Sequence, residues 1–178
     1  MGVLRFRRPG GVTLVVAVFG ALCLAGCGRA VDSVRDPLLE ILVPAQVTVQ
    51  AQDVAGLGSV LSDGQEMTLY MFPPDAGRRV SCTGPCAGTW PPLVVGAGGK
   101  VIAGTGVDAA DLGTLADPNT GERIVTYAGF PLYRYAGDLR AGTANGQGLF
   151  LNGGPWYVLS ADGQPITVTP APAARVGS

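Results

Sequence analysis

The chain reads Leu69-Tyr70-Met71-Phe72-Pro73-Pro74-Asp75, and the same pattern returns as Leu132-Tyr133-Arg134-Tyr135-Ala136-Gly137-Asp138. Successive side chains of a strand lie on opposite faces, so the two aromatic residues of each copy share one face and the residue between them lies on the other. The aspartate follows just after the strand end, where its carboxylate can accept backbone N–H bonds from its own loop. The two copies predict a duplicated unit in which an aromatic strand ends in a turn held by an aspartate.

Tight-turn signals separate short apolar runs on both sides of these copies. The chain has 28 glycines and few patterns long enough for a helix, which is typical of an all-β domain. Asp-Gly tips tolerate positive φ, so their twist suits the two strands of a hairpin. We therefore expect hairpins with turns at Ser62-Asp63-Gly64-Gln65, Asp117-Pro118-Asn119-Thr120-Gly121, Ala128-Gly129 and Ala161-Asp162-Gly163-Gln164.

Further matches extend the duplication beyond the aromatic strands. Leu57-Gly58-Ser59-Val60 corresponds to Leu112-Gly113-Thr114-Leu115, and Trp90 corresponds to Trp156. Order and spacing persist through both copies, as expected for an internal repeat. We expect repeat 1 at about residues 57–95 and repeat 2 at about residues 112–162, paired across a pseudo-twofold axis into one small sandwich or barrel-like domain.

The N-terminus carries the features of an export signal. Three arginines at positions 5, 7 and 8 precede an apolar run, Val12 to Leu22, that is too short to span a bilayer. Leu24-Ala25-Gly26-Cys27 follows and resembles the lipobox of bacterial lipoproteins, in which the cysteine is linked to diacylglycerol. We expect Cys27 to become the lipidated first residue and Cys23 to be lost. An ordinary signal peptide or an uncleaved helix is the alternative.

The chain divides by composition into four parts. Prolines and charges mix with short apolar stretches before the repeats, and three prolines mark the C-terminal end. Val31 to Leu42 has the partial apolar periodicity of a short helix, which Pro37 interrupts. We expect a lipoprotein signal peptide at residues 1–26, a lipidated N-terminus and tether at residues 27–52, the repeat domain at residues 53–168 and a flexible tail at residues 169–178.

The charge and composition of the chain limit the classes of function that it can have. The net charge is −1, and because three arginines and no acidic residue precede Cys27, it is −4 (9 − 13) from Cys27 onward. This mild acidity argues against nucleic acid and against adhesion to anionic headgroups, so the membrane would be reached through the lipid. The chain has no histidine, which disfavours a hydrolase or a zinc enzyme. We expect a monomer without a cofactor.

Both aromatic strands fit the pattern Tyr-x-aromatic-x-x-Asp, and with it the chain resembles the bacterial secreted-repeat lipoproteins of unknown function. Cys82-Thr83-Gly84-Pro85-Cys86, which leads to Trp90, and the Asn145-Gly146-Gln147-Gly148 loop also resemble that family. The resemblance implies a cellular location and a fold class. It implies no activity, because no biochemical activity is agreed for the family. The motif residues that it marks are Tyr70, Phe72 and Asp75 in the first copy and Tyr133, Tyr135 and Asp138 in the second.

The twin motif admits three interpretations. In the first, Asp75 and Asp138 are structural and hold their own turns. In the second, they converge across the pseudo-twofold axis with the hydroxyls of Tyr70 and Tyr133 to bind a cation or a sugar. In the third, the two carboxylates cleave cell-wall sugars, although duplicated residues in similar environments would not acquire the split pKa values that this chemistry needs.

Cys82 and Cys86 are expected to form a disulfide outside the cytoplasm. A loop this short removes little entropy from the unfolded chain, so the bond would serve locally, by fixing the turn that presents Trp90. The alternative is copper or thiol redox handling, because soft thiolates and thioethers favour copper(I) and Met67 and Met71 lie nearby in sequence.

The sequence therefore predicts a lipid-anchored, extracytoplasmic and non-catalytic module that binds an unknown envelope partner or ligand. The twin Tyr and Asp strands would form its recognition edge. Copper or thiol redox handling through the cysteines and an enzyme acting on cell-wall sugars are the alternatives. Phe150, Trp156 and Tyr157 are predicted to pack in the core or at its rim.

Overall fold

A computed structural model describes residues 45–168 of the chain. The predicted signal peptide, the lipidated Cys27, the first part of the tether, the short helix and the C-terminal tail lie outside the described residues. Within residues 45–168, no helix combines the length and apolar character needed to cross a bilayer.

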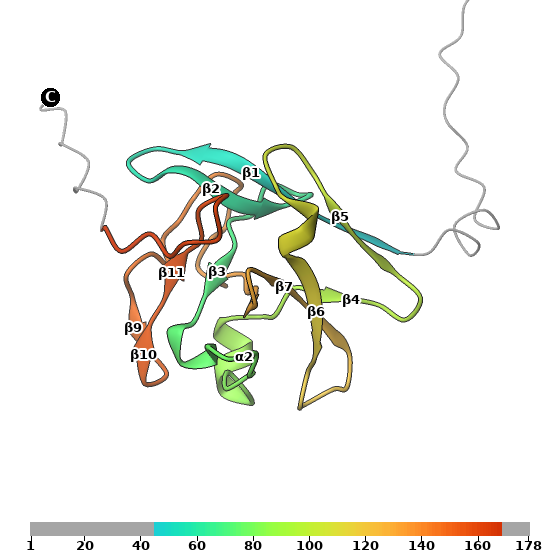
Figure 1. The fold of residues 1–178 in the computed structure, drawn as a ribbon. Helices are drawn as coiled ribbons and strands as arrows, with labels where there is room; N and C mark the ends of the chain where they lie inside the picture. The colour runs from blue at the N-terminus through green and yellow to red at the C-terminus, as the bar shows by residue number, and fades with distance from the viewer. Residues whose placement is uncertain (1–44, 169–178) are drawn as a thin grey trace, which may run out of the picture. The chain divides into compact units, whose positions relative to one another are not determined.

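The described residues are mostly strands joined by tight turns, so the all-β prediction is confirmed (Figure 1). Helical segments are short: the α-helix α2 (Pro85–Thr89) and the 3-10 turns η1 (Pro73–Asp75) and η2 (Ala109–Asp111). The strands are β1 (Gln46–Val54), β2 (Gly58–Asp63), β3 (Tyr70–Met71), β4 (Val94–Val95), β5 (Lys100–Ala103), β6 (Leu112–Ala116), β7 (Arg123–Tyr127), β8 (Phe130–Pro131), β9 (Phe150–Leu151), β10 (Gly154–Pro155) and β11 (Tyr157–Val158).

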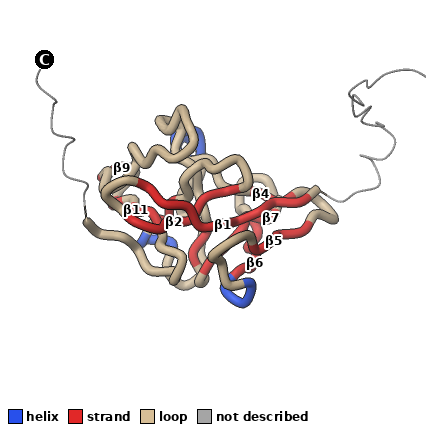
Figure 2. The backbone as a smooth tube through the Cα atoms, turned by 90° about the horizontal axis from the view of Figure 1, so that it is seen from above, coloured by secondary structure: helices blue, strands red, loops and turns tan. Residues whose placement is uncertain are grey.

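These strands lie in several small sheets and do not close into one barrel within residues 45–168. One sheet has the order β2-β1-β5, in which β1 pairs antiparallel with β2 and parallel with β5. Another has the order β4-β7-β6, with β8 also paired to β7. Two-stranded ladders join β9 to β10 and β11 to β3. Figure 2, viewed from above, shows β1 running across the near side of the described residues.

The predicted turns are present where the sequence placed them. Strands β6 and β7 pair antiparallel around the loop that begins at Asp117, and its carboxylate accepts the N–H of Asn119 at 2.7 Å. Strands β7 and β8 join through Ala128 and Gly129, whose φ angles of 47° and 84° are the positive pair that a tight hairpin requires. At Asp63 the chain reverses, and the N–H of Asp63 donates to the carbonyl of Met67 at 3.0 Å.

The predicted tether ends earlier than residue 52, because Gln46 already begins β1. Val47, Val49 and Ala51 alternate with polar residues, which is the period of a half-buried strand. The strand gains its stability from two neighbours that lie far apart in the sequence, β2 and β5. The mixed composition of residues 27–52 predicts a tether, although the alternation at residues 46–52 is that of a strand.

The core consists of two clusters, and the motif strand divides its side chains between them. Tyr70 and Phe72 pack in the first cluster, whereas Leu69 and Met71 pack in the second. The predicted alternation along this strand is therefore confirmed. Trp156 is also buried in the first cluster, as expected, but Phe150 is 72% exposed. The prediction for Phe150 is wrong because β9 pairs only with the neighbouring β10.

Candidate functional site

The two motif copies meet at their tyrosines. The N–H of Tyr70 donates to the carbonyl of Tyr133 at 2.8 Å, and the N–H of Tyr133 donates to the carbonyl of Tyr70 at 2.9 Å. This reciprocal pair forms an isolated antiparallel bridge between β3 and a segment that is distant in the sequence. The two repeats are therefore joined through the main chain at these two residues.

The side-chain hydrogen bonds at this bridge cross from one repeat to the other. The Tyr70 hydroxyl donates to Oδ2 of Asp138 at 2.5 Å, and the Tyr133 hydroxyl donates to Oδ2 of Asp75 at 2.6 Å. All four side chains are buried, and Asp138, the most exposed of them, has only 5% of its surface accessible. The structure thus joins the four polar residues of the motif in two pairs, and each tyrosine bonds the aspartate of the other copy.

The second carboxylate oxygen of each aspartate binds its own loop. Oδ1 of Asp75 accepts the N–H of Ser81 at 2.7 Å and the Ser81 hydroxyl at 2.5 Å. Oδ1 of Asp138 accepts the N–H of Asn145 at 2.8 Å. Each carboxylate therefore closes the loop that follows it and also receives a hydroxyl from the opposite repeat. This arrangement agrees with the turn-holding role of the first interpretation and adds a bond from each carboxylate to the opposite repeat.

An aromatic stack runs beside these bonds and also crosses between the repeats. The rings of Trp90 and Trp156 lie parallel, with centroids 3.9 Å apart. Phe72 of the first motif stacks on Trp156 of the second repeat at 4.4 Å, and Tyr135 of the second motif packs on Trp90 of the first repeat at 4.5 Å. Stacked and tilted ring pairs add stabilisation beyond the area they bury. Each repeat therefore completes the core of the other.

Each buried tyrosine also packs its ring edge against a tryptophan. Tyr70 contacts Trp90 at 5.3 Å and Tyr133 contacts Trp156 at 5.2 Å, both in edge-to-face geometry. Burial raises the pKa of each tyrosine far above its ordinary value, and the hydrogen bond to the aspartate raises the pKa further. Both hydroxyls therefore remain protonated donors. Because the motif lies in the interior, the prediction that its strands form an exposed recognition edge is wrong.

Cys82 and Cys86 form a disulfide, with Cα atoms 5.2 Å apart. Cys86 lies in α2, and its carbonyl accepts the N–H of Trp90 at 2.8 Å. The bond therefore lies directly before the buried tryptophan, where the sequence placed it. With the sulfurs joined to each other, this state offers no pair of thiolates to copper. Met71 packs in the second cluster, whereas both cysteines belong to the first.

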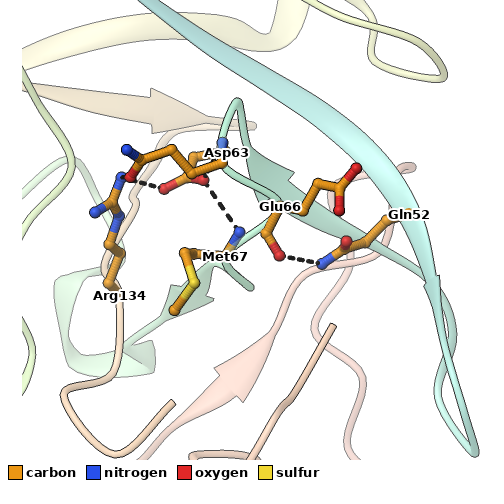
Figure 3. Close-up of polar contacts among 6 residues, drawn as sticks. Gln52, Asp63, Glu66, Met67 and Arg134 are labelled. Atoms are coloured by element: carbon orange, nitrogen blue, oxygen red, sulfur yellow. Dashed lines mark hydrogen bonds and ion pairs between the residues drawn. The ribbon is translucent and has the colours of Figure 1, made fainter. Parts of the chain in front are cut away.

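A polar groove at the surface was not predicted. It has a volume of about 420 Å³ and lies between the start of β1, the turn after β2 and β4. Figure 3 shows Arg134 directed at Asp63, with which it forms an ion pair, and the same guanidinium donates to Oε1 of Gln65 at 3.0 Å. Asp63 is only 2% exposed, and its other oxygen accepts the N–H of Met67 at 3.1 Å.

The repeats themselves contain the signal that marks this groove. The position between the two aromatic residues of the motif is Met71 in the first copy, and this side chain is buried. In the second copy the same position is Arg134, which lines the groove. An arginine in place of an apolar residue indicates that the two strands face different surroundings.

The buried tyrosines predict a loss of stability at alkaline pH. Their folded pKa values lie above that of an unfolded tyrosine, about 10, so their contribution is complete below pH ~10 and is lost as the pH rises further. We expect the free energy of unfolding to fall by up to about 1.4 kcal/mol per pH unit for each tyrosine. Urea unfolding between pH 8 and pH 11 measures this slope. Tyr70→Phe and Tyr133→Phe should each reduce it, and an unchanged slope in both variants would contradict the assignment.

Gly146 predicts a close-packing constraint. A Cβ atom there would lie 2.8 Å from Cη2 of Trp90 and 3.0 Å from Cε1 of Tyr70. We expect Gly146→Ala to lower the free energy of unfolding by about 1–3 kcal/mol because of overpacking. Gly88→Ala is the matched control, since a Cβ atom at Gly88 in α2 would meet nothing within 4 Å. Urea unfolding of both variants checks the difference, and equal stabilities would refute it.

The family assignment rests on a comparison with protein-family sequence profiles. The profile described as a secreted repeat of unknown function matches residues 53–94 and again residues 114–160. Searches of curated proteins and of solved structures gave no significant match. Each matched segment contains one complete copy of the motif, and the description places such repeats outside the cytoplasm. The chain therefore belongs to the family of secreted repeats of unknown function and carries two copies of its repeat.

Proposed function

We propose that the chain is a lipid-anchored, non-catalytic binding module of the bacterial cell envelope. The signal-like N-terminus ending at Cys27 supports the anchor, and the secreted character of the family agrees with it. The burial of Asp75 and Asp138 supports a non-catalytic role, because their oxygens are engaged by tyrosine hydroxyls and loop groups. A monomer then presents one surface to its partner.

The groove beside β1 carries the proposal. The pairing of β1 with β2 ends at Val49 and Asp63, whereas β1 itself begins three residues earlier, at Gln46. Residues 46–48 pair with β5 along their other edge only. The edge that faces the groove has no strand partner among residues 45–168. Uncovered strand edges are templates for pairing with another chain.

The direction of the main-chain groups agrees with this assignment. Ala45 and Val49 turn their carbonyls toward β5, where they accept the N–H groups of Lys100 at 2.9 Å and Gly104 at 2.7 Å. The N–H and C=O groups of successive residues point to alternate edges of a strand. Those of residues 46 and 48 therefore point away from β5, toward the groove. This is the arrangement in which an extended peptide adds a strand to a sheet edge.

The groove also indicates the chemistry of its partner. Its lining is mostly polar, with Gln46, Thr48 and Gln65 beside the ion pair of Asp63 and Arg134. Leu93 and Val94 supply an apolar wall. We therefore expect an extended segment of another envelope protein that alternates apolar and polar side chains, with main-chain hydrogen bonds providing affinity and the charged pair providing selectivity.

Lipid attachment is tested by metabolic labelling with an alkyne analogue of palmitate in a bacterial host. Cys27→Ala should lose both the label and the membrane fraction, because the thioether has no other acceptor at the cleavage site. Cys23→Ala is the matched control and should keep both, since this residue lies within the signal peptide. Label that persists in Cys27→Ala would refute the anchor.

The binding groove is tested by photo-crosslinking in the bacterium that encodes the chain. A benzophenone side chain at the exposed Gln46 should capture a protein partner, whereas the same group at the exposed Arg140, outside the groove, should not. Thr48→Pro should abolish capture because proline removes the N–H that faces the groove, and edge strands tolerate it. Mass spectrometry of the crosslink then identifies the partner segment.

Thr48→Val is the control for the proline variant. Valine keeps the backbone N–H and the branched shape of threonine, so capture should persist. Equal capture from Gln46 and Arg140, or capture unaffected by Thr48→Pro, would contradict docking at this edge. Thermal unfolding of both variants separates loss of binding from loss of fold.

A further inference from the structure

The buried rings of the two tryptophans and the two motif tyrosines, here called the aromatic array, have properties that a binding role does not use. Tryptophan and tyrosine are the side chains most readily oxidised by one electron outside sulfur chemistry. Here Trp90 and Trp156 stack at 3.9 Å, and each touches one buried tyrosine, with centroids 5.3 and 5.2 Å apart. Rings in van der Waals contact exchange electrons readily. The four rings therefore form one continuous path across both repeats.

Each tyrosine in this path has a base in place for its proton. A tyrosine gives up an electron easily only if its hydroxyl proton leaves with it. Oδ2 of Asp138 accepts the Tyr70 proton at 2.5 Å, and Oδ2 of Asp75 accepts the Tyr133 proton at 2.6 Å. By contrast, Tyr127 is buried as fully but donates to the carbonyl of Ala161 at 2.7 Å, and a carbonyl is a poor proton acceptor.

The tryptophans lack such a base. Nε1 of Trp90 is buried and has no hydrogen-bond acceptor among the residues that the structure describes. Nε1 of Trp156 donates only to the carbonyl of Leu151, at 3.2 Å. An oxidised indole here keeps its proton and stays a strong oxidant. It is therefore suited to oxidise the neighbouring tyrosine, whose proton can leave.

We propose that this array takes up an oxidising equivalent and stores it as a tyrosyl radical. A high-potential one-electron oxidant, of the class of small oxygen-derived or carbonate radicals, removes one electron from Trp90 and is itself reduced by one electron. Tyr70 then passes an electron to the Trp90 radical cation while its proton moves to Oδ2 of Asp138. The products are neutral Trp90, a neutral tyrosyl radical and a protonated carboxyl group.

The cycle closes with a one-electron donor of the thiol or ascorbate class. The donor is oxidised by one electron, Tyr70 is reduced, and the proton returns from Asp138 to the tyrosine oxygen. The related path through Trp156 uses Tyr133 and Asp75 in the same way. Tyr135 provides a connection to the surface, because it is only partly buried and packs on Trp90 at 4.5 Å.

Pulse radiolysis of the purified protein with the azide radical tests this proposal, because azide oxidises tryptophan first. We expect the absorbance of the tryptophan radical to decay as that of the tyrosyl radical grows, at a rate independent of protein concentration. Tyr70→Phe and Tyr133→Phe should each lose part of the growth, and the double variant should lose it. Tyr127→Phe is the matched control and should leave it unchanged.

A measurement on the unaltered protein keeps the test independent of how well the variants fold. Proton transfer to the aspartates predicts that the growth slows in D2O, whereas electron transfer alone would not. A tryptophan radical that persists without tyrosyl growth would overturn the proposal. Growth that scales with protein concentration, or that disappears in Tyr127→Phe, would also overturn it. None of these outcomes depends on the groove beside β1, so the two proposals stand or fall separately.

Discussion

Each motif tyrosine donates its hydroxyl to the aspartate of the other motif, and the rest of the domain depends on this exchange. A repeat folded alone would leave a tyrosine hydroxyl and one carboxylate oxygen without their partners, and an unpaired buried polar group costs about 1–3 kcal/mol, or more when it is charged. The tryptophan stack imposes the same dependence, because the second aromatic residue of each motif, Phe72 or Tyr135, packs on the tryptophan of the other repeat. Two repeats are therefore the smallest unit that satisfies its own polar groups. The disulfide before Trp90 and the loop that approaches it at Gly146 fit around that unit.

This interior role changes where function is to be sought. The Tyr-x-aromatic-x-x-Asp motif identifies the family, yet its tyrosines and aspartates are closed off from solvent. Surface properties come instead from positions at which the two copies differ. Arg134 occupies the place of Met71, and its ion pair with Asp63 gives the groove beside β1 its charged end. Duplication supplies the scaffold, and divergence at a single position, Arg134 in place of Met71, gives the groove its charged side chain.

Packing alone does not explain which residues are buried in the interior. A hydrophobic core of the same size would need no carboxylates, since buried charges cost free energy unless they are well paired. Here two carboxylates lie within hydrogen-bonding distance of oxidisable rings, while Tyr127, equally buried, bonds to a carbonyl. These tyrosines differ in the group that accepts their proton and not in how deeply they are buried. This difference is the basis of the redox proposal.

The sequence by itself determined the all-β class, the duplication, the hairpin turns and the alternation that divides the motif strand between two clusters. These features follow from turn chemistry and from the two-residue period of strands, which act between neighbours in the chain. It also indicated the Cys82–Cys86 bond, because the two residues are close in sequence. Only the tertiary structure decided that Tyr70 bonds Asp138 rather than Asp75, that β1 pairs with the distant β5, and that Phe150 is exposed while Arg134 lines a groove. Those choices depend on which distant segment lies across from each residue, and local periodicity carries no information about that partner.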